Sequence, residues 1–219
     1  TLDYFTPKFL LGMTATPERT DNFNIFELFD YNIAYEIRLQ EALEEDLLCP
    51  FHYFGVTDFE KENVVISETT DLKYLTMNDR VKFLIEKINY YGCSGNNPKG
   101  LVFCSRKEEA WELSVRFNQH KIPSTCLTGE HSIEEREAQI ERLESGEINY
   151  IFTVDIFNEG IDIPKINQVV MLRNTQSSII FVQQLGRGLR KDKSKEFVTI
   201  IDFIGNYKNN YMIPMALSG

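Results

Sequence analysis

From about residue 50 onward, short apolar runs alternate with amphipathic stretches along the chain. Apolar runs of this length are typical of buried strands, and apolar positions three and four residues apart are typical of helices. We expect strands near Phe51–Val56, Gly100–Cys104, Ser124–Thr128, Tyr150–Val154, Gln168–Leu172 and Phe197–Asp202. We expect helices at Asn78–Tyr91, Arg106–His120, Ile133–Leu143 and Ser177–Leu189. Because strands and helices alternate, the pattern predicts an α/β fold with a parallel sheet flanked by helices.

Two of these helices begin with the pattern of a capping box. In a capping box, a serine and a glutamate three residues later satisfy each other's backbone N–H groups. The two pairs are Ser105 with Glu108 and Ser132 with Glu135. They indicate that each helix starts just after its serine.

The first fifty residues do not follow this alternation. Phe9–Met13 is apolar at successive positions, as in a strand covered on both faces, and Pro17 blocks its continuation. After it we expect a short helix at Phe23–Phe29, a strand at Ile33–Arg38 and a helix at Leu39–Leu48.

The sheet to which the strand at Phe9–Met13 would belong is not in this sequence. We therefore expect residues 1–30 to be the tail of a preceding domain, residues 31–50 to be a linker region, and residues 51–219 to form a second domain.

Composition places the chain among ordinary globular proteins, with 42% hydrophobic and 26% charged residues. No run of about 18 apolar residues occurs and no signal peptide opens the chain, so we expect neither a membrane span nor secretion. The four cysteines form no CxxC pair, which indicates reduced thiols in a cytoplasmic protein. The three histidines lack metal-ligand spacing, so we expect no zinc site.

The net charge of −10 argues at first against nucleic-acid binding, because phosphate contacts need lysine and arginine. The charge is unevenly distributed, however. From Gln183 to Lys195 there are five basic residues against Asp192 alone, whereas Glu130–Glu147 is dominated by glutamate. Local charge decides which surface meets a polyanion, so the total does not exclude one.

The basic stretch contains the segment QQLGRGLR, in which Gln183, Arg187 and Arg190 are four and three residues apart. On a helix these three side chains share one face. Two guanidinium groups that stay charged suit a polyphosphate whose charge grows during reaction, which is the chemistry of an arginine finger. An isolated segment of this kind would be explained equally by a solvated basic helix.

Polar residues follow two of the expected strands, where ligands of open parallel sheets bind. Ser105 and Arg106 follow one strand at a helix start, where backbone amides favour phosphate, although a plain N-cap explains them too. Thr128 and Gly129 end the next strand with a hydroxyl and a residue that permits close backbone approach, but a turn would look the same.

A more specific loop follows the strand at Tyr150–Val154. In the segment TVDIFNEGIDIP, Thr153 stands at the strand end, Gly160 permits a bend, and Asp162 comes just before Pro164 fixes the backbone. This arrangement presents polar groups at the edge of the sheet.

Five segments occur in the order found in superfamily 2 helicases and translocases: LGMTATPERTD, LVFCSRK, LTGEHS, TVDIFNEGIDIP and QQLGRGLR. They resemble, in turn, motif III, motif IV, the threonine-glycine motif of the second domain, motif V and motif VI. The match covers roughly residues 9–202 and looks like the branch that includes type III restriction-enzyme subunits and related DNA repair helicases. The resemblance implies that residues 51–219 have a RecA-like fold and that residues 1–30 end a first RecA-like domain.

For the nucleotide, the resemblance implies that Arg187 and Arg190 reach the γ-phosphate of ATP from across a cleft between the two domains. Gln183 then couples the nucleotide to the motor, and Asp162, with Gly160 beside it, contacts the ribose.

For the second ligand, the resemblance implies a track for DNA, with RNA also possible. Ser105, Arg106, Thr128 and Thr153 would hold nucleic-acid phosphates. Thr14 and Thr16 would link the state of ATP to strand binding.

Two motifs of such motors are absent from the sequence. No GxxxxGK followed by serine or threonine occurs, since the nearest segment, GCSGNNPKG at Gly92–Gly100, lacks the Gly-Lys-Ser/Thr ending, and no DExH or DEAD box occurs. We therefore expect ATP with Mg²⁺ to be bound mainly by the missing first domain, and this chain alone to be inactive. An interaction module that keeps the fold without catalysis is the alternative. A Rossmann site is discounted because Gly186-x-Gly188 lacks a third glycine.

Overall fold

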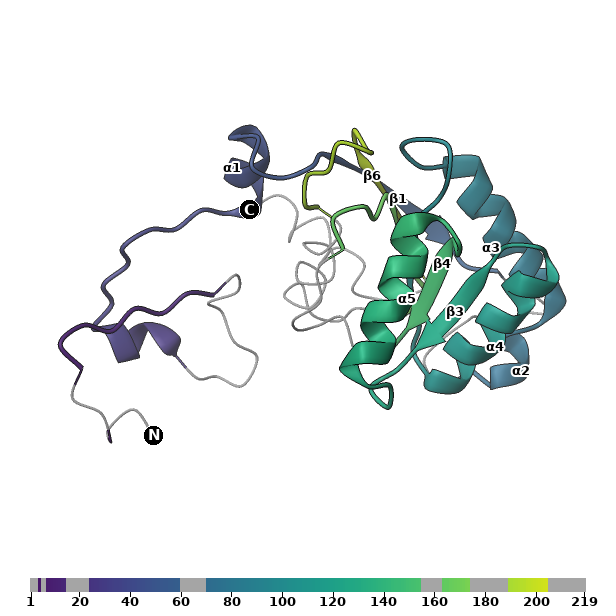
Figure 1. The fold of residues 1–219 in the computed structure, drawn as a ribbon, viewed down its shortest axis with the longest axis horizontal. Coiled ribbons are helices and arrows are strands. Elements are labelled where there is room, and N and C mark those ends of the chain that lie inside the picture. Colours follow the sequence, from purple (N-terminus) through teal and green to yellow (C-terminus); the bar gives the residue numbers. More distant parts are fainter. Residues whose placement is uncertain are drawn as a thin grey trace. The chain divides into compact units, whose positions relative to one another are not determined.

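The computed structural model of the chain describes residues 4, 7–14, 24–59, 70–154, 163–173 and 189–204. It divides into two compact units, Thr1–Arg38 and Leu39–Gly219 (Figure 1). The larger unit contains the sheet and all of the described residues that are buried, so it is described first.

The larger unit is built on a sheet of six parallel strands. They are β1 (Phe51–Thr57), β2 (Gly100–Phe103), β3 (Ser124–Leu127), β4 (Tyr150–Thr153), β5 (Gln168–Met171) and β6 (Val198–Ile204). All six expected strands are confirmed to within two residues at either end, and the order across the sheet is β1-β6-β5-β2-β4-β3. The α/β fold with a parallel sheet is therefore confirmed.

Helices cover both faces of this sheet (Figure 1). On one face, α3 (Asn78–Tyr91) and α4 (Lys107–Gln119) bury Leu84 and Phe117 in a cluster with Phe152 of β4. On the other face, α5 (Ile133–Ser145) buries Leu143 in a second cluster. Burial of strands on both faces is what a parallel sheet requires, and it explains why their sequences read as continuous apolar runs. Among the described helices, none has the length and apolar character to cross a membrane.

The helix starts differ in how they are capped. Ser132 forms the expected capping box with Glu135, each satisfying the other's backbone N–H. The expected box of Ser105 with Glu108 is wrong. The N-cap of α4 is Arg106, without a side-chain bond, and the Ser105 N–H donates instead to the carboxylate of Glu109. Glu109 is drawn inward because it faces a buried arginine, whereas Glu108 stays exposed.

The residues just before β1 pack against the core of the larger unit. The expected helix at Leu39–Leu48 is present as the shorter α1 (Leu39–Glu44), and a short helix that the sequence did not indicate, α2 (Leu72–Leu75), precedes α3. Leu39 and Leu48 pack against the core cluster on the α5 face, and Cys49 N–H donates to the carbonyl of Leu189. The structure thus groups residues from Leu39 onward with the sheet, although we expected a linker up to residue 50. Of the helix expected at Ser177–Leu189, residues 177–188 lie outside the described residues.

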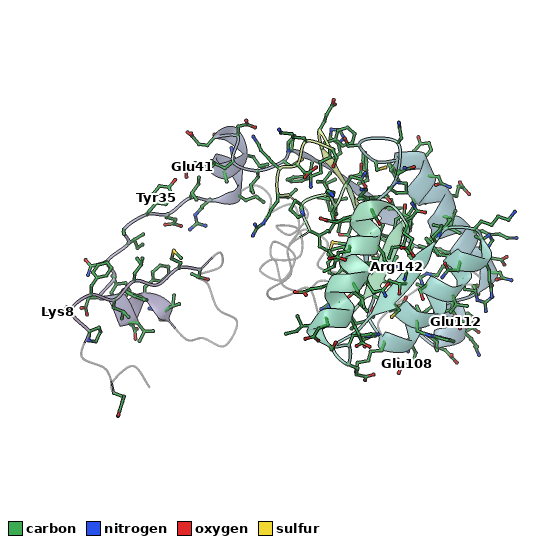
Figure 2. All side chains as sticks on the ribbon, viewed as in Figure 1. Lys8, Tyr35, Glu41, Glu108, Glu112 and Arg142 are labelled. Carbon is green, nitrogen blue, oxygen red and sulfur yellow. The ribbon has the colours of Figure 1, made fainter. Side chains whose placement is uncertain are left out.

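The smaller unit buries none of its described residues, 4, 7–14 and 24–38. The expected helix at Phe23–Phe29 is a 3₁₀ helix, η2 (Ile25–Phe29), and the ring of Phe29 lies so close to Gly12 that a Cβ there would come within 2.5 Å of it. The strand expected at Ile33–Arg38 is wrong: these residues form no strand, and Tyr35 is 76% exposed (Figure 2). A strand needs a neighbour for its backbone N–H and C=O groups, and none pairs with this segment among the described residues.

The segment at Phe9–Met13 is likewise not a strand in this chain. Phe9, Leu11 and Met13 are 78%, 61% and 90% exposed. Apolar side chains at successive positions are thus presented to solvent rather than to a sheet.

Candidate functional site

The carboxyl ends of β2, β4 and β3 lie side by side in the sheet. Thr153 at the end of β4 is in register with Phe103 of β2 and with Leu127 of β3. Because the three strands are parallel, the segments that follow them emerge at one edge. The structure therefore brings together the loop of Ser105 and Arg106, the end of β4, and Thr128, which are far apart in the sequence.

Thr128 opens a tight turn after β3. Its N–H donates to Nδ1 of His131 at 3.1 Å, and its hydroxyl accepts the N–H of Glu130 at 3.4 Å. The N–H of His131 in turn donates to the Thr128 carbonyl at 3.2 Å. Thr128 is only 7% exposed, so the hydroxyl is held within this turn and presents little surface to a ligand.

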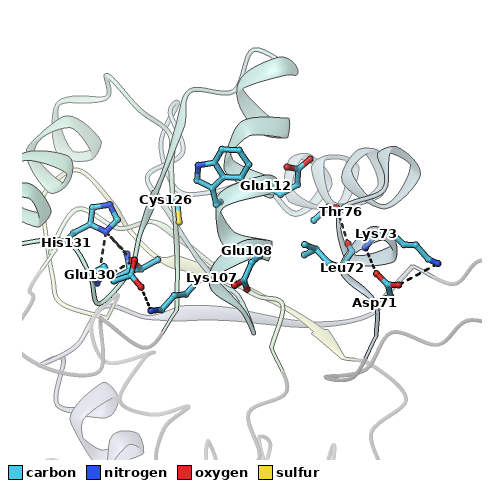
Figure 3. A pocket seen from close by; sticks show the side chains of 12 residues that line it. Asp71, Leu72, Lys73, Thr76, Lys107, Glu108, Glu112, Cys126, Glu130 and His131 are labelled. Atoms are coloured by element: carbon cyan, nitrogen blue, oxygen red, sulfur yellow. Dashed lines mark hydrogen bonds and ion pairs between the residues drawn. The ribbon is translucent and has the colours of Figure 1, made fainter.

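A broad depression of about 900 Å³ lies next to Thr128, between α2, α4 and the end of β3 (Figure 3). Acidic side chains outnumber basic ones on its lining: Asp71, Glu108, Glu112 and Glu130 against Lys73 and Lys107. Both lysines form ion pairs within the lining, at 3.6 Å with Asp71 and 2.6 Å with Glu130. The hydrogen bond between Lys107 and Glu130 raises the pKa of the lysine and lowers that of the carboxyl. Such a lining repels a phosphate backbone, so the depression itself does not suit nucleic acid.

The loop after β2 is fixed by a buried carboxylate. The N–H of Ser105 donates to Oε2 of Glu109 at 3.1 Å, and Glu109 is fully buried. This amide is therefore not available to a phosphate, contrary to the simple expectation for a helix start. The side chain of Arg106, half-buried at the N-cap of α4, remains the basic group of this loop.

The other oxygen of Glu109 faces Arg80 of α3, which is fully buried. Arg80 Nη1 donates to Glu109 Oε1 at 3.2 Å and to the Leu75 carbonyl at 2.6 Å. Its Nε and Nη2 donate to the two carboxylate oxygens of Asp58, after β1, at 3.1 and 2.8 Å. A buried guanidinium has five N–H donors that need partners, and this cluster supplies acceptors for four of them, from the residue after β1, from α2 and from α4.

The cluster holds one guanidinium and two carboxylates, and their proximity shifts the pKa values of Arg80 and Glu109. Burial on its own would lower the pKa of Arg80, but Asp58 and then Glu109 raise it overall, so the guanidinium stays charged. Burial raises the pKa of Glu109, and Arg80 and the Ser105 N–H oppose that effect. The sequence contained a signal for both residues: Arg80 lies at helical spacing with Leu84 and Ile88, and Glu109 with Leu113 and Phe117. A charged residue on an apolar helix face requires a buried partner.

Thr153 is placed at the strand end as expected, but its side chain is fully buried. Its hydroxyl has no hydrogen-bond partner among the described residues. A buried hydroxyl without a described partner is unusual.

Of the remaining expected site residues, two are described by the structure and five lie outside the described residues. Arg190 is exposed and follows Leu189, which is fully buried in the core. Thr14 is exposed in the smaller unit. Five others lie outside the described residues: Thr16, Gly160, Asp162, Gln183 and Arg187.

The basic stretch after Arg190 is partly used inside the domain. Lys195 is 7% exposed and its ammonium donates to the Ile166 carbonyl at 2.7 Å. Lys191 forms an ion pair with Asp46 at 2.5 Å. The positive charge that the sequence suggested for this stretch is therefore smaller at the surface than its composition implies.

Within the described part of the chain, we find neither a reactive cysteine nor a metal-binding group. All four cysteines are free, and burial raises the pKa of the Cys104 thiol well above its usual value, which disfavours the reactive thiolate. Among the same residues no group of three or more His, Cys, Asp or Glu side chains could hold a metal ion.

Comparison with known proteins adds a family match at this point. Residues 79–192 match the family model described as the helicase conserved C-terminal domain. The chain is 28% identical over 203 residues to a Saccharomyces cerevisiae protein assigned as the ATP-dependent helicase IRC3, covering 90% of this chain and 29% of that protein. It is 25% identical over 235 residues to the Escherichia coli type I restriction enzyme EcoAI endonuclease subunit, covering 92% and 28%.

The fold also matches a solved structure. A fragment assigned as an HsdR subunit of a type I restriction enzyme from Vibrio vulnificus YJ016 superposes with a TM-score of 0.74 at 26% identity. The match covers all of this chain and 44% of that one. The chain therefore spans less than half the length of each of these relatives.

Proposed function

The chain belongs to the helicase C-terminal domain family of superfamily 2, and we propose that it is the C-terminal half of the motor of a longer ATP-dependent DNA helicase or translocase. The observation that carries this proposal is the adjacency of β2, β4 and β3, which gathers three of the motif-like segments at one edge of the sheet. The likeness to restriction-enzyme subunits favours DNA, although phosphate contacts would serve RNA as well.

In this proposal the nucleotide lies between this domain and a preceding RecA-like domain, which residues 1–30 would complete. Arg187 and Arg190 supply positive charge to the γ-phosphate, with Gln183, Gly160 and Asp162 around the rest of the nucleotide. ATP with Mg²⁺, held mainly by the preceding domain, would supply the energy of domain movement. Exposed Arg190 directly after core-anchored Leu189 suits such a role, because its backbone is fixed while its side chain is accessible.

The nucleic acid in this proposal is held through its phosphates. Arg106 and Ser105 after β2 and Thr128 after β3 flank Thr153 at the end of β4, so together they would follow one strand. Thr14 and Thr16 would couple the nucleotide to this track. Contacts to phosphates carry no sequence information, so we expect binding without sequence preference.

A comparison of the 219-residue chain with the longer protein tests this proposal. The longer protein should hydrolyse ATP faster when single-stranded DNA is added. The 219-residue chain should hydrolyse none above background, because it lacks a phosphate-binding lysine loop and a metal-binding acid. Nucleic-acid-stimulated turnover by the pure 219-residue chain would contradict this division of the site.

A module that binds a protein partner without catalysis is the second candidate. The net charge of −10 and the acidic lining beside Thr128 favour this candidate, because both would repel a polyanion such as nucleic acid. The two candidates differ in one simple measurement, since only the motor should bind DNA with an affinity that falls steeply with salt.

A further inference from the structure

Glu109 connects the buried arginine of α3 to the loop that follows β2. One of its carboxylate oxygens lies 3.2 Å from Arg80 Nη1 and the other lies 3.1 Å from the Ser105 backbone nitrogen. Arg80 is itself held by both oxygens of Asp58. The position of the Ser105 backbone is therefore set by three elements packed behind it: the end of β1, α3 and α4.

Helix stability alone does not explain this arrangement. The sequence offers a surface capping box, Ser105 with Glu108, that would cap α4 without burying a charge. The structure instead buries Glu109 completely, and the cost of taking a carboxylate and a guanidinium out of water can exceed the gain from their attraction. Such a pair contributes little net stability, but it fixes the direction in which the loop leaves the strand.

We propose that Glu109 is a positioning residue, which holds the Ser105–Arg106 backbone so that the Arg106 side chain meets a nucleic-acid phosphate. The inference rests on the proposed function, because it needs Arg106 to contact the nucleic acid. Glu109 itself touches no ligand. Arg80 orients the carboxylate, and the Ser105 N–H is the group through which the carboxylate acts.

The test measures binding of a fluorescein-labelled single-stranded DNA of mixed sequence to the full-length protein by anisotropy. Arg106→Ala should weaken binding about tenfold and reduce the slope of log affinity against log salt by about 0.7, the amount expected for one phosphate contact on a single strand. Glu109→Gln keeps the size of the side chain but leaves only one acceptor oxygen, which the charged Arg80 takes in preference to the Ser105 N–H. It should weaken binding threefold to tenfold, roughly, with a similar loss of slope.

Two variants are the controls. Asp58→Asn weakens the same buried cluster but leaves the bond between Glu109 and Ser105, so it should lower the melting temperature and change affinity less than about twofold. Glu112→Gln makes the same substitution one turn along α4, in a partly exposed pair with Arg116, and should change neither.

The double variant Glu109→Gln with Arg106→Ala separates a positioning role from a structural one. If Glu109 acts through the loop, the double variant binds no more weakly than Arg106→Ala alone. Two results would overturn the inference and leave Glu109 with a structural role. One is a double variant in which the two losses of DNA affinity multiply, and the other is a loss of affinity in Asp58→Asn equal to that in Glu109→Gln.

Hydrogen exchange of the Ser105 amide distinguishes failure of the inference from failure of the proposed function. Glu109→Gln should speed exchange of this amide at least tenfold, roughly, because its acceptor is lost. Unchanged protection of the Ser105 amide would overturn the inference, whatever the result of the DNA-binding measurements. Faster exchange together with an Arg106→Ala variant that binds DNA normally would remove Arg106 from the proposed track, and the inference would fall with it.

Discussion

The hydroxyl of Tyr53 on β1 donates a hydrogen bond of 2.7 Å to Oδ2 of Asp202 on β6. The two strands are neighbours, with Tyr53 in register with Ile200 and Gly55 in register with Asp202. Asp202 is 4% exposed, and burial raises its pKa to about 6, even though the bond from Tyr53 lowers it. The outermost strand is thus joined to the sheet through a carboxyl group that titrates near neutral pH.

The first prediction concerns stability against pH. In the unfolded chain Asp202 ionises near pH 3.8, and in the folded protein near pH 6, so between these values the folded state binds more protons. The free energy of unfolding therefore falls as pH rises through this window and is constant above it. A pKa difference of this size corresponds to about 3 kcal/mol. In urea titrations between these pH values, the free energy of unfolding of Asp202→Asn should lack the decrease that Asp202 causes.

Tyr53→Phe provides the complementary variant. It removes the bond that lowers the pKa of Asp202, so the decrease should extend to higher pH than in the unmodified protein. Identical pH profiles for Asp202→Asn and the unmodified protein would show that Asp202 is not the group responsible.

The second prediction concerns the buried arginine. Arg80→Leu leaves the carboxylates of Asp58 and Glu109 without their cation, and breaking a buried pair in this way costs about 3–5 kcal/mol. Equilibrium denaturation of the unmodified and variant proteins measures the loss. Arg142→Leu, which breaks an exposed pair with Glu147, should cost less than about 1 kcal/mol. Equal losses of unfolding free energy in the two variants would contradict the prediction that breaking the buried pair costs more than breaking the exposed one.

The third prediction concerns the proposed arginine fingers. In the full-length protein, Arg187→Ala or Arg190→Ala should lower kcat by roughly a thousandfold or more while weakening ATP binding only modestly, because a finger acts mainly in the transition state. Steady-state kinetics with saturating DNA provide the measurement. Unchanged turnover with weaker binding would leave both arginines as surface charges.

The fourth prediction concerns the two strand-end threonines. Thr128→Ala and Thr153→Val should weaken nucleic-acid binding by similar amounts on any sequence, because the proposed contacts are to phosphates. Thr153→Val replaces a buried hydroxyl without a described partner by a methyl group of the same shape, so it should not destabilise the fold. Anisotropy titrations on several DNA sequences provide the test, and a loss confined to one sequence would remove these residues from the track.

The fifth prediction concerns the exposed apolar segment at the start of the chain. Leu10–Met13 should exchange its amide hydrogens quickly in dilute, monomeric 219-residue chain, because its side chains are exposed and the segment forms no strand. Val102 and Phe103 of β2, which are buried in the sheet, provide the protected reference. Protection of Leu10–Met13 equal to that of Val102 would show that the segment has a partner within this chain.

Several features could be predicted from the sequence because they depend on local patterns. Apolar runs gave the six strands, helical spacing gave α3, α4 and α5, and the Ser132 capping box needs only residues within one turn. The order of the motif-like segments likewise gave the family. Failures occurred where a local pattern needs a distant partner. We expected a strand at Ile33–Arg38, but this segment has no neighbour to pair with among the described residues.

Only the tertiary structure decided which distant groups meet. The sheet order places β6 beside β1, although the paired residues Phe51 and Val198 are far apart in the sequence. It also buries Glu109 against Arg80, which displaces the expected cap at Ser105. The physical reason is the same in each case. Periodicity shows that a side chain is buried, but the partner of a buried polar or charged group depends on which elements pack together around it.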